Sequence, residues 1–155
     1  MIDRLEALRE RGALPGYIAV EGPIGVGKTT LARRLAETLN YDVFLEHTGE
    51  NPFLERFYRD PRGHALQTEL FFLFQRAEQL RQMRQNNLFE QVRVSDFLIE
   101  KNRLFAGVNL DADEYQLYEN VHQHLTLDAP APDLVVYLQA PTEVLRERIL
   151  RRGTA

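Results

Sequence analysis

The sequence predicts an α/β fold, and two observations carry that prediction. Residues 17–30 combine a short apolar strand, a glycine-rich loop and the start of an amphipathic helix. Three more short apolar stretches alternate with longer segments that show helical periodicity, and they lie at residues 42–46, 92–96 and 133–138. Strands that alternate with helices in this way are typical of α/β proteins.

Composition narrows the functional classes. Apolar residues make up 44% of the 155 residues and charged residues 27%, which is ordinary for a soluble globular protein. The absence of cysteine excludes disulfides, cysteine metal sites and cysteine nucleophiles. A net charge of -4 disfavours a nucleic-acid partner, and no apolar stretch is long enough to cross a bilayer. We expect a cytoplasmic protein with a helical extension over residues 1–15 and one domain over residues 16–155.

The glycine-rich loop matches the Walker A phosphate-binding motif G-x-x-x-x-G-K-[ST]. Its glycines let backbone amides face a polyphosphate, Lys28 reaches the β and γ phosphates, and Thr29 can hold Mg²⁺. The alternative is a glycine turn that binds nothing, which the preceding strand and the following helix disfavour. The predicted nucleotide-binding residues are Gly22, Pro23, Ile24, Gly25, Val26, Gly27, Lys28, Thr29 and Thr30.

Two carboxylates stand at the ends of predicted strands. Glu46 ends the stretch 42–46, and Asp96 ends the stretch 92–96. The carboxyl ends of parallel strands border the ligand crevice, so Glu46 is either a residue near the phosphate loop or a solvated strand end. Asp96 is positioned to organise a metal ion, and it could also cap the helix predicted over residues 98–108.

Two helices carry further candidates. In the long helix predicted over residues 64–84, Glu69, Phe72 and Arg76 share one face, and spacing alone favours a surface salt bridge between the two charged residues. The helix predicted over residues 141–152 ends in a basic cluster. This cluster either complements the helix dipole or clamps nucleotide phosphates, and it contains Arg146, Arg148, Arg151 and Arg152.

Five segments, taken in order, resemble bacterial deoxynucleoside kinases of the deoxyadenosine, deoxyguanosine and deoxycytidine kinase type. They are residues 18–30, 50–58, 65–76, 94–97 and 132–138. The resemblance implies a three-layer α/β P-loop kinase fold, with a parallel sheet wrapped by helices. It also implies ATP and Mg²⁺ as cofactors, a homodimer, and transfer of the γ-phosphoryl group to the 5′-hydroxyl of a deoxynucleoside.

The resemblance also implies roles for single residues. Glu46 matches the carboxylate that accepts the 5′-hydroxyl proton, and with Lys28 and Arg76 it makes up the expected catalytic set. Tyr58 matches the tyrosine that holds the sugar 3′-hydroxyl, and Phe105 matches the aromatic residue that stacks on the base.

Further roles concern the metal ion and the phosphates. Thr29 and Asp96 fall at the Mg²⁺-organising positions. Arg151 and Arg152 fall where arginines of the lid contact phosphate.

The sequence departs from the family pattern at several positions. Glu69 stands where relatives usually carry a base-binding glutamine, and an ionised carboxylate accepts hydrogen bonds but cannot donate them. Phe97 stands where the motif after Asp96 has arginine, and residues 101–102 are Lys-Asn where relatives often have a base-reading aspartate. The chain stops about where the lid begins, so we expect a truncated protein with four strands and no fifth.

Two other functions are weighed against the nucleoside kinase. A nucleoside monophosphate kinase such as thymidylate kinase shares the loop and the sheet, but Glu46 and Tyr58 favour a neutral sugar acceptor. The second alternative is a nucleotide-binding module without catalysis.

Overall fold

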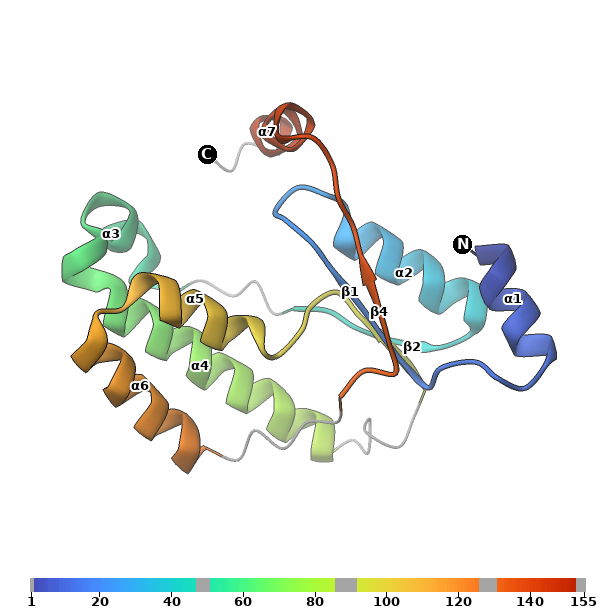
Figure 1. Ribbon diagram of the computed structural model, residues 1–155, viewed down its shortest axis with the longest axis horizontal. Coiled ribbons are helices and arrows are strands. Elements are labelled where there is room, and N and C mark those ends of the chain that lie inside the picture. The colour runs from blue at the N-terminus through green and yellow to red at the C-terminus, as the bar shows by residue number, and fades with distance from the viewer. Residues whose placement is uncertain (1, 47–50, 86–91, 126–130, 153–155) are drawn as a thin grey trace. The chain divides into compact units, whose positions relative to one another are not determined.

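The computed structural model describes residues 2–46, 51–85, 92–125 and 131–152 (Figure 1). The helices are α1 (Ile2–Glu10), α2 (Lys28–Leu39), α3 (Leu54–Arg59), α4 (Pro61–Gln85), α5 (Lys101–Asn109), α6 (Ala112–His124) and α7 (Thr142–Arg151). The strands are β1 (Tyr17–Glu21), β2 (Asp42–Phe44), β3 (Arg93–Ser95) and β4 (Leu134–Tyr137). In this described part of the chain, none of the helices combines the length and the apolar character that a membrane span requires.

The chain divides into two compact units, which are described separately. The sheet unit comprises Met1–Glu46, Leu88–Leu98 and Ala131–Ala155. The helical unit comprises His47–Asn87 and Ile99–Pro130.

The sheet unit contains a parallel sheet with the strand order β2-β3-β1-β4. Ile18 of β1 lies in register with Val94 of β3 on one side and with Leu134 of β4 on the other. Ile18, Ala19 and Val20 are fully buried, as expected for a central strand of a parallel sheet. The four-stranded parallel sheet and its flanking helices confirm the predicted fold class.

Helix α2 packs against the sheet and ends at the predicted position. Leu35 and Leu39 are buried in the core cluster that includes Ile18. Asn40 closes the helix in the left-handed conformation, with φ 57°, where asparagine is tolerated better than most residues. Leu5 of α1 belongs to the same core cluster, so the N-terminal helix contributes an apolar side chain to the sheet unit. The domain boundary between residues 15 and 16 stays a prediction.

The helical unit is formed by α3, α4, α5 and α6. Its core contains Ala65 and Leu73 of α4 together with Ala106 of α5 and Tyr118 of α6. Helix α4 begins before the predicted residue 64, because proline is compatible with the first helical turn. Helix α6 begins with a capping box, in which the side chain of Asp111 accepts from the Glu114 amide at 2.8 Å and the Glu114 side chain accepts from the Asp111 amide at 3.1 Å.

Helix α5 starts later than the sequence predicts. It begins at Lys101 rather than at Leu98, and Glu100 is its N-cap residue, so the expectation that Asp96 caps this helix is wrong. The physical reason is that the Leu98 amide donates to the carboxylate of Glu21 at 2.9 Å, and Asp96 is held by two other donors.

Candidate nucleotide-binding site

The glycine-rich loop between β1 and α2 has the backbone that phosphate binding requires. Gly22 has φ 153°, and a Cβ atom there would lie 2.6 Å from the carbonyl oxygen of Leu138, so the position has no room for a side chain. Gly27 has φ 103° and directly precedes the first residue of α2. The first turn of α2 carries no acidic residue, so the positive end of the helix dipole favours an anion there.

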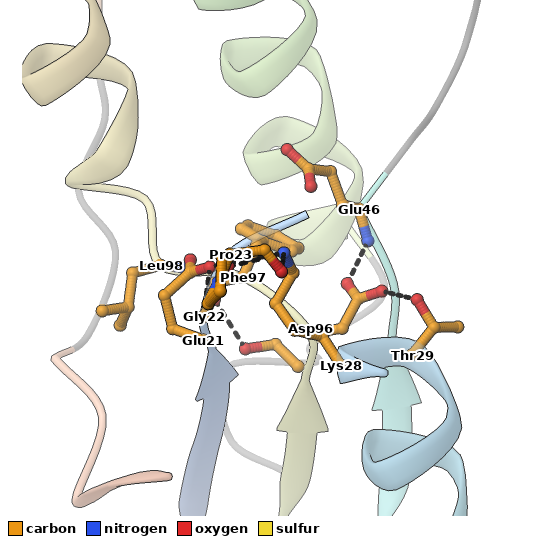
Figure 2. Close-up of polar contacts among 10 residues, drawn as sticks. Glu21, Gly22, Pro23, Lys28, Thr29, Glu46, Asp96, Phe97 and Leu98 are labelled. Carbon is orange, nitrogen blue, oxygen red and sulfur yellow. Dashed lines mark hydrogen bonds and ion pairs between the residues drawn. The ribbon is translucent and has the colours of Figure 1, made fainter. Parts of the chain in front are cut away.

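The side chain of Lys28 lies over this loop (Figure 2). Its Nζ atom donates to the carbonyl oxygen of Gly22 at 2.8 Å and to that of Pro23 at 3.4 Å. The same atom lies 3.9 Å from Oε1 of Glu21. The loop therefore holds the ammonium group of Lys28 in a defined place through its own carbonyl oxygens.

Asp96 joins three elements of the sheet unit. Its Oδ2 atom accepts a hydrogen bond from Thr29 Oγ1 at 2.6 Å, and its Oδ1 atom accepts from the backbone amide of Glu46 at 2.6 Å (Figure 2). Asp96 is only 5% exposed, so these bonds are shielded from water. The structure thus brings together Thr29 and Asp96, the two predicted metal-organising residues, and it places the Glu46 backbone beside them.

Glu21 is a residue of this site that the sequence analysis missed. Its Oε1 atom accepts from the Gly22 amide at 3.0 Å, and its Oε2 atom accepts from the Leu98 amide at 2.9 Å. The signal that could have found it is the one used for Glu46 and Asp96, namely a carboxylate at the end of a strand.

The basic cluster of α7 lies against the glycine-rich loop. Arg148 donates from Nη1 to the carbonyl oxygens of Val26 at 3.1 Å and Gly25 at 3.5 Å. Arg151 and Arg152, the predicted phosphate contacts, line a hollow of about 520 Å³ beside the loop. Arg151 also forms an exposed ion pair with Glu147 at 2.6 Å. The remaining residues lining the hollow are Gly25, Val26, Gly27, Thr30, Leu31, Arg34, Leu138 and Arg148.

The predicted substrate residues Glu69 and Arg76 lie in the helical unit, and the expectation of a surface salt bridge between them is wrong. Both are 4% exposed. Glu69 accepts from Asn109 Nδ2 at 2.9 Å, and Arg76 donates to Asn102 Oδ1 at 3.1 Å and to Gln79 Oε1 at 2.8 Å. Helix α5 thus supplies polar partners that a pattern within α4 alone does not reveal.

The electrostatic environment of Glu69 follows from its burial. Desolvation raises the pKa of its carboxyl group above the ordinary value, and the hydrogen bond from Asn109 offsets part of that effect. The two predicted aromatic contacts differ from Glu69 in exposure, because Tyr58 is 70% exposed and Phe105 is 56% exposed. The substrate roles of these residues stay predictions.

A parallel sheet with a glycine-rich loop, a loop lysine and a strand-end acid beside the loop threonine defines the class of P-loop nucleotide-binding proteins. Within that class, the family model "Deoxynucleoside kinase" matches residues 18–155. The chain belongs to the deoxynucleoside kinase family.

Relatives with curated names agree with this assignment. The chain is 36% identical over 138 residues to a deoxyguanosine kinase of Bacillus subtilis, in an alignment that covers 88% of this chain and 67% of the relative. It is 33% identical to a deoxyadenosine kinase of Dictyostelium discoideum, covering 88% of this chain and 57% of that protein. The chain therefore spans about two thirds or less of the length of these relatives.

Solved structures give the same result. A deoxyadenosine kinase from M. mycoides with bound dCTP superposes with a TM-score of 0.70 and 27% sequence identity. The superposition covers 88% of this chain and 70% of that one.

Proposed function

We propose that the protein transfers the γ-phosphoryl group of ATP to the 5′-hydroxyl of a deoxynucleoside and so produces a deoxynucleoside monophosphate. The observation that carries this proposal is the formed phosphate loop, with Lys28 held over it and Thr29 bonded to Asp96, in a chain of the deoxynucleoside kinase family. The comparisons support a nucleoside acceptor and give no support to a monophosphate kinase.

The loop and its lysine would supply most of the catalytic effect. Phosphoryl transfer proceeds through a loose transition state, so positioning and charge stabilisation matter more than proton removal. The backbone amides at the start of α2 would bind the phosphates. The Lys28 ammonium would stabilise the negative charge that develops between the β and γ phosphates. Arg151 and Arg152 beside the loop would add positive charge on the outer side of the triphosphate.

The site also fits Mg²⁺. The hydroxyl oxygen of Thr29 and a carboxylate oxygen of Asp96 meet at 2.6 Å, and both are the hard oxygen ligands that this ion prefers. We propose that these two residues hold the ion, which when bound neutralises charge on the phosphates.

The acceptor side of the reaction rests on the family resemblance. In this proposal Glu46 accepts the proton of the 5′-hydroxyl, and Arg76 lies near the 5′ end of the substrate. Tyr58 holds the 3′-hydroxyl, Phe105 stacks on the base, and Glu69 contacts the edge of the base. The exposed rings of Tyr58 and Phe105 are accessible for such contacts. We further propose a homodimer in the cytoplasm, by analogy with the family.

A direct assay tests the proposal. The protein is incubated with γ-labelled ATP and Mg²⁺, and each of the common deoxynucleosides and their monophosphates is offered separately as acceptor. We expect label in the deoxynucleoside monophosphate only. Lys28→Ala should abolish transfer, whereas the matched control Arg33→Ala, on an exposed position of the same helix, should retain it. A folded protein without measurable affinity for ATP would refute the proposal, and ATP binding without transfer would favour the non-catalytic nucleotide-binding module.

A further inference from the structure

Glu21 lies at the end of β1, and its carboxylate is held in a fixed orientation. One carboxylate oxygen accepts from the Gly22 amide at 3.0 Å, and the other accepts from the Leu98 amide at 2.9 Å (Figure 2). The side chain is 15% exposed. Because both oxygens have a backbone donor, the carboxylate cannot rotate without breaking a bond to the loop or to the segment after β3.

The Lys28 ammonium faces this fixed carboxylate. Oε1 of Glu21 lies 3.9 Å from Lys28 Nζ, and the carbonyl oxygens of Gly22 and Pro23 accept from the same nitrogen. The Lys28 side chain is 18% exposed, so solvent screens this attraction less than it screens an ion pair on the open surface. Glu21 Oε1 and these two carbonyl oxygens thus lie around the ammonium beside the loop.

We propose that Glu21 is a positioning residue, which holds the Lys28 ammonium beside the glycine-rich loop and competes with a bound polyphosphate for it. This inference rests on the proposed function, because the competing ligand is the triphosphate of ATP. The carboxylate has two opposing effects. It keeps Lys28 close to the place where it is needed, and its negative charge weakens the binding of a polyanion next to it.

The reactivity of the lysines tests the contact in the free protein. The chain contains two lysines, Lys28 and Lys101, so each can be followed by mass spectrometry after brief acetylation with a succinimidyl ester. The contact with Glu21 keeps the Lys28 side chain close to the loop and limits its access to the reagent, so Glu21→Gln should speed acetylation of Lys28 several-fold. Acetylation of Lys101 is the internal control and should not change. Glu21→Asp, which keeps the charge, should stay closer to the wild-type rate than Glu21→Gln.

The affinity for ATP tests the competition. Glu21→Gln should bind ATP several-fold more tightly by calorimetry, and it should turn over more slowly because Lys28 is less well positioned. A purely structural role would instead weaken binding and turnover together. The matched control is Glu37→Gln, which removes the same charge from an exposed position of α2 away from the loop. Its affinity for ATP should stay near that of the wild type.

The outcomes separate this inference from the proposed function. Equal Lys28 acetylation in the wild type and in a folded Glu21→Gln variant would overturn the inference, as would a parallel increase at Lys101, which would indicate general loosening. Weaker or unchanged ATP binding by Glu21→Gln would also overturn it. If the wild type binds no ATP, the proposed function fails, while the acetylation rates still decide whether Glu21 holds Lys28.

Discussion

Replacement of Asp96 by asparagine tests how the site is built. Asp96 is 5% exposed and accepts one hydrogen bond on each carboxylate oxygen, from Thr29 Oγ1 and from the Glu46 amide, both at 2.6 Å. Asparagine has one acceptor oxygen, so its NH₂ group must face one of these two donors. The amide oxygen can still accept from the Glu46 amide, and the NH₂ group can donate to Thr29 Oγ1, because a hydroxyl group also accepts hydrogen bonds. The variant therefore replaces two hydrogen bonds to a charged group by two neutral ones.

The expected cost follows from the strength of such bonds. A hydrogen bond to a charged group contributes about 1.5–3 kcal/mol and a neutral one about 1 kcal/mol, so Asp96→Asn should lower the free energy of unfolding by about 1–3 kcal/mol. Asp96→Ala removes both acceptors and should cost about 3–6 kcal/mol. Because the native state of a domain is stabilised by only about 5–15 kcal/mol, either loss is large enough to measure.

Urea denaturation followed by circular dichroism measures these values. Thr29→Val removes one of the two donors and leaves the bond from the Glu46 amide, so it should cost about 1–2 kcal/mol. The costs of Thr29→Val and Asp96→Asn should not add, because the two residues share one bond. If the free energy of unfolding of Asp96→Asn lay within about 0.5 kcal/mol of the wild-type value, the reasoning would be contradicted, since the carboxylate would then contribute little to stability.

Three more variants give expected outcomes. Burial raises the pKa of Glu69 in the folded state, so the stability that the protonated Glu69 contributes is complete at acid pH and is lost as the pH rises through that pKa. In urea titrations, Glu69→Gln should therefore gain stability relative to the wild type as the pH increases. The Tyr118 hydroxyl is buried without a hydrogen-bond partner in the described residues, so Tyr118→Phe should raise the free energy of unfolding by about 1 kcal/mol, and a loss of stability would reveal a partner. Gly22→Ala places a Cβ atom 2.6 Å from the Leu138 carbonyl oxygen, so calorimetry should detect far weaker ATP binding than in the wild type, and normal affinity would show that the loop relaxes freely.

The sequence predicted the parts of the fold that local rules determine. The loop motif, the alternation of strands and helices, and the helix stop at Asn40 all depend on a few neighbouring residues. The position of Asp96 directly after β3 was also predictable, since parallel strands bring their carboxyl ends to one edge. The prediction that Glu46 ends its strand is wrong, because β2 ends at Phe44, two residues earlier.

The rest depends on contacts between distant segments, which periodicity does not contain. Glu69 and Arg76 were expected at the surface because the spacing within α4 shows two charges on one face, whereas their partners Asn109 and Asn102 lie on α5. The late start of α5 has a similar cause. The Leu98 amide is used by Glu21, which lies 77 positions earlier in the chain.

The order of the strands explains why the polar side chains of Lys28 and Thr29 have separate partners. Lys28 and Thr29 are adjacent in sequence, yet one faces Glu21 at the end of β1 and the other bonds to Asp96 directly after β3. These strands are neighbours in the sheet, with Ala19 in register with Ser95, so the two carboxylates emerge side by side at one edge. A different strand order would separate them, and the loop would then lose the partner of one side chain while its own sequence stayed unchanged. The sheet therefore determines that Glu21 faces Lys28 and that Asp96 accepts from Thr29.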